Sequence, residues 1–346
     1  DDKQDEVKNM DNYEPPYSIS DKMLTLVSSI SEKVGRIEIS KEIESKPHLR
    51  KNNKIHSIYS SLKIEANSLS LTEVRDVING QSVIGNQKEI QEVKNAYAAY
   101  EKIADVDPSS MVDLKKIHKI MTDGIINESG EFRTGAEGVF SGEKCIFIAP
   151  PANMINDLMR DLLSWVKKNQ DKIHPLIMSA VFHYEFVFIH PFADGNGRMA
   201  RIWHTIFLYR WRKVFEYIPL ENQIEKFQED YYEAIAQCHV NGNSNVFIEF
   251  MLERIDEVLD EVIAQVKKSK GEMSEYVNRL LNCMEYDLPY TSKEILELLA
   301  LKSKETLRKN YLNPAIEAGL VRMTLPEKPN SKNQRYIKLY EGVIKR

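Results

Sequence analysis

Cysteine is scarce in this sequence, and long apolar runs are missing. The 346 residues include 3 cysteines, which lie far apart and form no CxxC pair. A disulfide framework is therefore excluded, and we expect a reduced, cytoplasmic setting. No apolar run approaches the length that spans a bilayer, and no secretory leader is visible, so we expect no membrane partner. The remaining composition, 42% apolar and 29% charged, is that of an ordinary globular protein.

Positive charge is in slight deficit, and it is unevenly spread. The whole chain has a net charge of −5, which argues against a protein that coats nucleic acid. From Asp287 to the end, however, 12 Lys and Arg stand against 7 Asp and Glu, which gives +5 there and −10 for the rest. A basic C-terminal segment on an acidic body leaves DNA contact by that segment open.

Apolar residues recur at intervals of three and four through most of the chain, which predicts helices. Residues 1–16 are polar and proline-containing, and we expect a flexible N-terminal arm there. Residues 17–267 are expected to form a mainly α domain. The predicted helices cover residues 20–42, 47–66, 71–78, 90–103, 111–125, 153–165, 176–189, 199–207, 227–238 and 246–267.

One stretch of this domain favours strands. Val139-Phe140 and Cys145-Ile146-Phe147-Ile148 are two β-prone runs that flank a glycine-containing turn, which predicts a β-hairpin. A two-stranded hairpin on a helical body is poorly stabilised alone. We therefore expect its exposed edge to take up an extended peptide through main-chain hydrogen bonds.

The C-terminal part has a different order of elements. After a connecting helix over residues 268–285, a capped helix starts at Thr291, and a second helix covers residues 304–319. Two strand-like runs, 320–325 and 335–339, then flank a polar loop. Helix, turn, helix and hairpin are typical of a winged helix, and we predict one, an α+β fold, over residues 286–346. Its basic residues fit either a contact with DNA or a protein-contact or dimerisation surface.

The stretch between the predicted helices 176–189 and 199–207 contains the residues suited to catalysis. Gly195-Asn196-Gly197 lets a phosphate approach the free N–H groups at a helix start. Arg198 and Arg201 share one face of that helix and can clamp phosphate oxygens. Asp194 is a single carboxylate suited to Mg²⁺, and His190 can act as a general base at neutral pH. These are the parts that phosphoryl or nucleotidyl transfer requires.

Residues 190–201, His-Pro-Phe-Ala-Asp-Gly-Asn-Gly-Arg-Met-Ala-Arg, resemble the signature of the Fic family, HPFx(D/E)GN(G/K)RxxR, at every specified position. The lead-in 182–189 and the hairpin that ends in Ala149-Pro150-Pro151, where the family has its flap, are also similar. The resemblance implies a Fic-type helical bundle that transfers AMP from ATP to a Ser, Thr or Tyr hydroxyl of a target protein, with Mg²⁺ as cofactor.

The resemblance also implies a role for each site residue. His190 would deprotonate the acceptor, Asp194 would hold Mg²⁺, and Arg198 and Arg201 would bind phosphates with the cradle of Gly195, Asn196 and Gly197. The stretch that contacts adenosine in relatives corresponds to Tyr231, Tyr232 and Asn241. The target-binding flap would comprise Val139, Phe140, Cys145, Ile146, Phe147 and Ile148.

Ser61 and Glu65 share a helix face four residues apart, and on their own they indicate a solvated polar face that ends in Asn67 as a C-cap. Many Fic proteins, however, have an inhibitory helix that reads (S/T)xxxE(G/N). The resemblance therefore implies an N-terminal inhibitory helix over about residues 47–67, whose Glu65 pairs with Arg201. Ala66 stands where the family has Gly or Asn.

Three further functions stay open at this point. The same site could remove AMP or do both reactions, or it could transfer a different phosphate-bearing group. Alternatively, the chain could be a winged-helix DNA-binding regulator whose helical domain senses nucleotide. The intact His190 favours an enzyme, since a sensor requires no base there. A homodimer is implied by the family resemblance.

Overall fold

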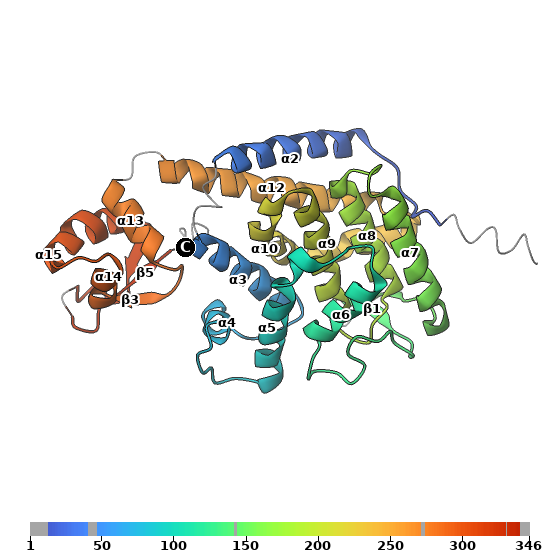
Figure 1. The fold of residues 1–346 in the computed structure, drawn as a ribbon, viewed down its shortest axis with the longest axis horizontal. Helices are drawn as coiled ribbons and strands as arrows, with labels where there is room; N and C mark the ends of the chain where they lie inside the picture. The colour runs from blue at the N-terminus through green and yellow to red at the C-terminus, as the bar shows by residue number, and fades with distance from the viewer. Residues whose placement is uncertain (1–12, 41–46, 142–143, 271–273, 330, 340–346) are drawn as a thin grey trace, which may run out of the picture. The chain divides into compact units, whose positions relative to one another are not determined.

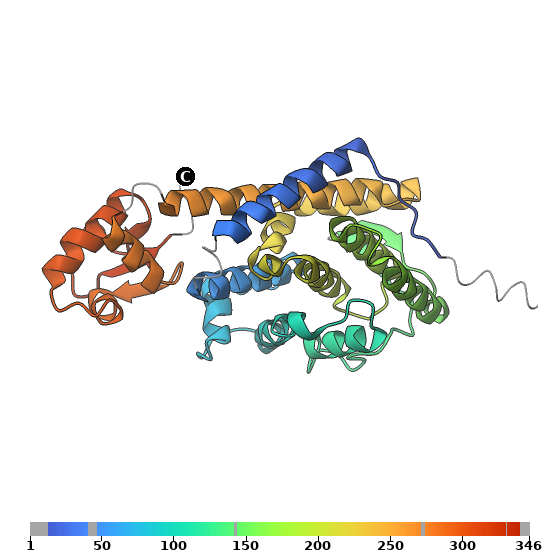
Figure 2. The same cartoon turned by 45° about the horizontal axis from the view of Figure 1, so that its top comes forward.

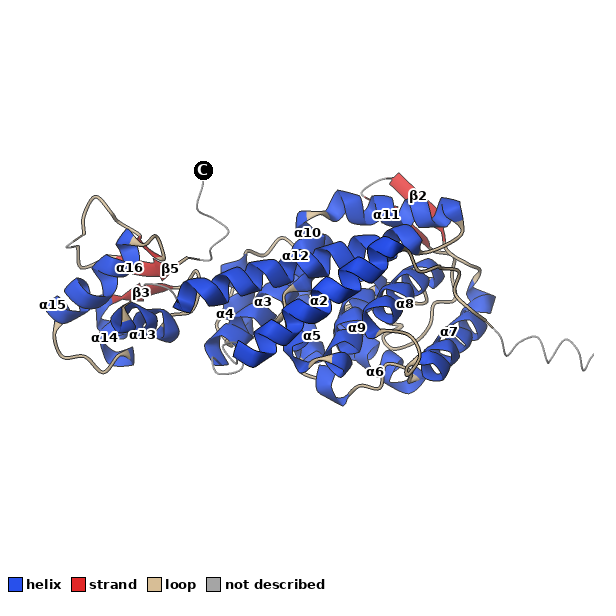
Figure 3. Cartoon of the chain, turned by 90° about the horizontal axis from the view of Figure 1, so that it is seen from above, coloured by secondary structure: helices blue, strands red, loops and turns tan. Residues whose placement is uncertain are grey.

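The computed structural model describes residues 13–40, 47–141, 144–270, 274–329 and 331–339. The chain divides into two compact units: residues up to Gly35 with Lys54–Leu259, and Arg36–Asn53 with Asp260 onward. Figure 3 shows that helices dominate, with strands limited to one hairpin and one small sheet in the described part. The predicted mainly α fold is confirmed. No described helix is long and apolar enough to cross a bilayer.

The first unit is a helical bundle built around two consecutive helices, α8 and α9 (Figure 1). Both are buried on nearly all sides, which explains why α8 lacks a polar face. The predicted helices are present, and α10 is an additional short one. The helices that lie wholly or mainly in this unit are α2 (Asp21–Ser40), α3 (Pro47–Ile64), α4 (Leu71–Ile78), α5 (Gln87–Tyr100), α6 (Met111–Met121), α7 (Ile155–Asn169), α8 (Pro175–Ile189), α9 (Asn196–Trp211), α10 (Leu220–Lys226), α11 (Gln228–Asn241) and α12 (Asn245–Lys270).

Helix α2 lies beside α12 in both Figure 1 and Figure 2. Polar side chains join the two helices: the Ser29 hydroxyl donates to the Asp256 carboxylate at 2.7 Å, and Lys33 Nζ lies 2.9 Å from the same carboxylate. Helix α2 is thereby fixed to α12.

Residues 13–16, the described part of the flexible arm expected over residues 1–16, contact the bundle. The Tyr13 hydroxyl donates to the buried Glu185 carboxylate at 2.6 Å, and the Pro16 carbonyl accepts from Ser244 N–H at 3.0 Å. Residues 13–16 are therefore anchored to the bundle, because burying the Glu185 carboxylate requires a donor. Residues 1–12 lie outside the described residues.

The predicted hairpin is present as β1 (Gly138–Ser141) and β2 (Lys144–Ile148), which pair antiparallel. Phe147 is buried and stacks on Phe188 of α8 and His239 of α11, whereas Ile148 is exposed. The Phe147 side chain thus attaches strand β2 to the bundle. The backbones of four other predicted flap residues lie in these strands, but their side chains fall outside the described part: Val139, Phe140, Cys145 and Ile146.

The second unit has its own core and a three-stranded antiparallel sheet of order β3-β5-β4. The predicted order of helix, turn, helix and hairpin is present, and β3 is an additional strand. The segment expected as a connector over residues 268–285 differs, because Val277, Leu280 and Met284 pack into this core. The elements are α13 (Glu275–Cys283), β3 (Pro289–Thr291), α14 (Ser292–Leu298), α15 (Lys304–Thr306), the π-helical η5 (Leu307–Leu312), α16 (Asn313–Glu317), β4 (Val321–Met323) and β5 (Arg335–Lys338).

Candidate active site

Two residues in left-handed conformation bound the loop between α8 and α9. His190 ends α8 with φ 50° and ψ 59°, and Gly195 precedes α9 with φ 83°. Between them, the Asn196 amide closes the loop, since its Nδ2 donates to Phe192 O at 2.7 Å and its Oδ1 accepts from Phe192 N–H at 2.9 Å. The side chain of Asn196, predicted to lie in the anion cradle, therefore shapes that cradle from within.

His118 of α6 supports the loop from below. Its Nδ1 accepts from Gly130 N–H at 2.9 Å, so Nε2 carries the proton and donates to Asp194 O at 2.9 Å. Its ring stacks on Phe192 at 3.6 Å, and burial lowers its pKa to about 4. The sequence indicated no more than a packed helix residue here. The structure makes His118 a neutral support of the motif.

Arg198 makes few hydrogen bonds for a buried, charged side chain. Its Nη2 donates to Asp194 Oδ1 at 2.9 Å, an oxygen that also accepts from Gly195 N–H. Its Nη1 lies 3.8 Å from Glu92 of α5, and neither Nη1 nor Nε has a hydrogen-bond partner although the side chain is 4% exposed. Because buried donors are normally satisfied, these two N–H groups are available to a ligand such as a phosphate.

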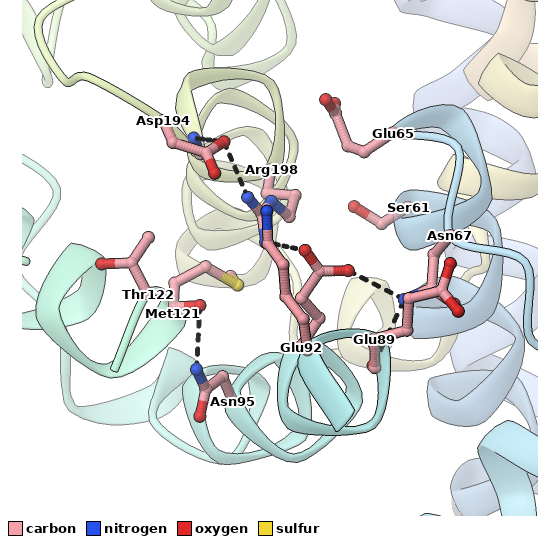
Figure 4. Close-up of polar contacts among 12 residues, drawn as sticks. Ser61, Glu65, Asn67, Glu89, Glu92, Asn95, Met121, Thr122, Asp194 and Arg198 are labelled. Atoms are coloured by element: carbon pink, nitrogen blue, oxygen red, sulfur yellow. Dashed lines mark hydrogen bonds and ion pairs between the residues drawn. The ribbon is translucent and has the colours of Figure 1, made fainter. Parts of the chain in front are cut away.

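Arg201, three residues later, donates from Nε and Nη2 to residues of α3 and its end. Its Nε donates to the Ser61 hydroxyl at 3.0 Å, and its Nη2 donates to Ser61 O at 3.0 Å and to Glu65 Oε1 at 2.6 Å. Burial alone would lower the pKa of Arg201, but Glu65 raises it above the usual value. A Cβ placed on Gly197 would collide with the Glu65 carboxylate. Figure 4 shows Ser61 and Glu65 reaching from α3 toward the start of α9.

The end of α3 explains how Glu65 reaches that position. Ala66 N–H donates to Lys63 O at 3.0 Å, Asn67 N–H donates to Leu62 O at 3.1 Å, and Ala66 has φ 64°. This is a Schellman motif in which Ala66, and not the predicted Asn67, occupies the left-handed C′ position. Asn67 instead donates its amide N–H to Glu92 at 2.8 Å, so Glu92 lies between the end of α3 and Arg198 (Figure 4).

His190 is poised to accept a proton. Its Nδ1 donates to Val187 O at 3.3 Å, which leaves the lone pair on Nε2. Burial, with a smaller effect of the Arg133 charge, lowers the pKa of His190 to about 4, against the hydrogen bond to Val187 O and the charges of Glu65 and Asp194, which raise it. The imidazole is therefore neutral at pH 7, as a general base must be.

The residues predicted to contact adenosine are not all beside the loop. Tyr231 is buried, its hydroxyl lies 2.9 Å from His183 Nε2, and Arg201 is among the groups that affect its pKa. Tyr232 is half-buried, and burial and then Glu65 raise its pKa. Asn241 ends α11 and is exposed, and no described contact links it to residues 190–201. The tyrosines thus border the Glu65–Arg201 pair.

Comparisons with known proteins agree with this geometry. A model of the Fic/DOC family matches residues 108–208, and a model of the Filamentation induced by cAMP protein Fic-like C-terminal domain matches residues 275–338. A Fic family protein from Desulfovibrio desulfuricans, solved by crystallography, is 39% identical, with 96% of this chain and 100% of that chain covered and a TM-score of 0.71. The chain belongs to the Fic family.

Curated relatives of this Fic protein are more distant. Protein adenylyltransferase Fic of Aedes aegypti is 28% identical over 215 residues, which are 60% of this chain and 41% of the relative. Protein adenylyltransferase fic-1 of Caenorhabditis elegans is 23% identical over 262 residues, 73% and 49% of the two chains. This Fic chain therefore spans about half the length of the curated relatives it matches. A C. elegans Fic-1 structure, 22% identical with a TM-score of 0.59, shares the fold.

Proposed function

We propose that this Fic protein is a protein adenylyltransferase, which transfers AMP from ATP to a Ser, Thr or Tyr hydroxyl of a target protein. The observation that carries the proposal is that neutral His190 and the unsatisfied donors of Arg198 flank one glycine-rich turn. Relatives that bear the name protein adenylyltransferase support the same chemistry.

The proposed reaction is one displacement at phosphorus. The acceptor hydroxyl oxygen forms a bond to the α-phosphorus of ATP, the bond from that phosphorus to the bridging oxygen breaks, and pyrophosphate leaves. The hydroxyl proton goes to His190 Nε2. Arg198 and the free N–H groups at the start of α9 would stabilise the charge on the phosphates.

Asp194 fits a Mg²⁺ ligand. Its Oδ1 accepts from Gly195 and Arg198, whereas its Oδ2 has no described hydrogen bond and the side chain is 38% exposed. The described residues contain no group of three or more His, Cys, Asp or Glu that could hold an ion by themselves. Asp194 would therefore share the ion with phosphate oxygens, as Mg²⁺ sites commonly do, and the ion would supply charge neutralisation when bound.

The proposed enzyme restrains itself through Glu65. The carboxylate occupies Arg201 and covers Gly197, so ATP would lack one of its two arginine partners. Substitution Glu65→Gly should then raise self-modification by ATP and Mg²⁺ by about tenfold or more, because one charge-assisted contact is worth about 1.5–3 kcal/mol.

Mass spectrometry of the intact protein measures this directly, as the gain of one AMP moiety. Glu65→Gln is the matched control for the charge, and Glu65→Gly with His190→Ala is the control for catalysis. Equal labelling of the wild type and Glu65→Gly would contradict the restraint, and no AMP on either would contradict the proposed reaction.

A second reaction, removal of AMP from a modified protein, is favoured by one observation. Glu65 has a side chain that is 33% exposed, and its carboxylate lies against Gly197, in the same 190–201 stretch as His190. A carboxylate beside a neutral histidine can orient a water molecule. Release of AMP from a pre-labelled protein by the wild type, but not by Glu65→Gly, would establish this activity.

A further inference from the structure

Arg133 lies in the loop between α6 and β1, outside the 190–201 stretch. Its side chain is 4% exposed, and it forms no ion pair within 4.0 Å in the described part of the chain, although the charge of Glu137 acts on it. It uses its donors on main-chain carbonyls instead. A buried guanidinium without a close ion pair is costly unless its donors are satisfied, and here main-chain carbonyls satisfy them.

Two of the carbonyls belong to the base of the hairpin. Arg133 Nη1 donates to Gly135 O at 2.6 Å, and Nη2 donates to Pro150 O at 2.7 Å. These residues lie just outside the pair that closes the hairpin, in which Ala149 N–H donates to Glu137 O at 3.0 Å. One guanidinium therefore joins the two legs of the flap.

The other carbonyls belong to the start of the catalytic stretch. Arg133 Nε donates to His190 O at 2.7 Å, and Nη2 also approaches Ile189 O at 3.4 Å. The main-chain N–H of Arg133 donates to Pro191 O at 2.9 Å. The planar guanidinium thus bridges the flap and the catalytic turn, a geometry that a lysine ammonium cannot reproduce.

His190 needs such support. A residue with a Cβ in the left-handed region costs about 1–2 kcal/mol, and it persists only where the surroundings fix it. The contacts of Arg133 with Ile189 O before this strained residue, and with His190 O and Pro191 O after it, lie on both sides of it.

We propose that Arg133 is a positioning residue that couples the flap to the catalytic histidine. The inference rests on the proposed AMP transfer. An extended target segment that pairs with the hairpin would be placed in the same rigid frame as His190, so that the acceptor hydroxyl meets the base at hydrogen-bond distance. Charged groups that face the imidazole are Arg133, Glu65 and Asp194, and the cation opposes its protonation.

The test uses the full chain with Glu65→Gly as the parent, and adds Arg133→Lys or Arg133→Gln. Arg160→Gln on α7, whose side chain is 52% exposed, is the matched control. We expect both Arg133 variants to lower kcat for self-labelling by about 10- to 100-fold, as misplacement of catalytic groups does, with KM for ATP unchanged. Hydrogen exchange of the β1 and β2 amides should accelerate in both. The His190 imidazole, followed by NMR, should titrate at higher pH in the Gln variant than in the Lys variant.

Each outcome of these measurements supports or overturns the coupling of the hairpin to His190 through Arg133. Parent-like kcat and parent-like hairpin exchange in Arg133→Lys would overturn the coupling, and so would a loss confined to KM for ATP. If Arg133→Gln does not fold, the Lys variant, which keeps the charge, gives the answer alone. If the parent itself gains no AMP, the proposed reaction fails, whereas exchange and titration still decide whether Arg133 links the hairpin to His190.

Discussion

Arg198 and Arg201 lie three residues apart on the same helix, yet their surroundings differ. Arg201 donates to Ser61 and Glu65, which belong to a segment more than 130 positions upstream. Arg198 contacts Asp194 within its own motif and has two unsatisfied N–H groups. One arginine of the proposed phosphate site thus has a carboxylate at the end of α3 as partner, and the other has two buried N–H groups without a partner in the described part.

This difference assigns the two arginines different proposed roles: Arg198 in binding phosphate, and Arg201 in the control of activity by Glu65. Under the proposed function, Arg198 would bind phosphates while Glu65 stays in place, because no carboxylate of α3 pairs with it. Arg201 can do so only after Glu65 leaves, which requires movement at the end of α3. The proposed restraint would therefore act on one charge in the site and leave the base and the proposed metal ligand intact.

We expect the largest change in ATP affinity when each arginine is replaced in turn, and the two variants should differ in their dependence on Glu65. Arg198→Gln should weaken ATP binding about 10- to 100-fold both in the wild type and in Glu65→Gly, since charge-assisted hydrogen bonds are lost. Arg201→Gln should have a comparable effect only in Glu65→Gly. Calorimetry with a non-hydrolysable ATP analogue and Mg²⁺ measures both. An equal loss for Arg201→Gln in the two backgrounds would show that Glu65 does not mask this arginine.

The sequence predicted the parts of this site that lie in one segment. Residues 190–201 form a specific pattern, and the hairpin and most helices followed from periodicity. The contact of Glu65 with Arg201 came from family resemblance, because Ser61 and Glu65 alone read as a solvated face.

Contacts made by single residues could not be predicted. Arg133, His118 and Glu92 carry no motif, and a charged or imidazole side chain in a loop or on a helix gives the same sequence signal whether it is buried or solvated. Their partners are fixed by the approach of segments far apart in the chain. The three-residue strand β3 is likewise too short to show alternation.

A second test weakens the hydrogen bonding of Arg201 to α3 while Glu65 stays in place. Ser61→Ala deletes the hydroxyl that accepts from Arg201 Nε at 3.0 Å, a bond worth about 1 kcal/mol. We expect self-labelling to rise about fivefold, as measured by mass spectrometry. Ser60→Ala is the neighbouring control, because that hydroxyl contacts Asn222 and Glu225 instead. A matching rise in both variants would point to general loosening of α3.

Replacing Glu92 should change ATP affinity less, and it tests the surroundings of Arg198. Its carboxylate is 3.8 Å from Arg198 Nη1 and also accepts from Asn67. Glu92→Gln removes one negative charge from the phosphate site, and we expect ATP to bind about two- to threefold more tightly, in keeping with the modest worth of such a loose pair. Glu89→Gln on the same helix, which contacts Ser68, should leave ATP affinity unchanged. Weaker binding in Glu92→Gln would mean that the carboxylate orients Arg198 for phosphate.

The smallest expected effect lies at Ala66, which sits at φ 64° in the C′ position of α3. Glycine adopts this conformation without the Cβ penalty, so Ala66→Gly should stabilise the helix end by about 0.5–1 kcal/mol and hold Glu65 more firmly on Arg201. Ala66→Val, which brings a β-branched side chain to the same position, should have the opposite effect. Thermal unfolding and self-labelling should therefore move in opposite directions across the series Val, Ala, Gly. If stability changes while labelling stays constant, the end of α3 does not set the occupancy of Arg201, and the difference between the two arginines would have to be maintained by Ser61 and Glu65 alone.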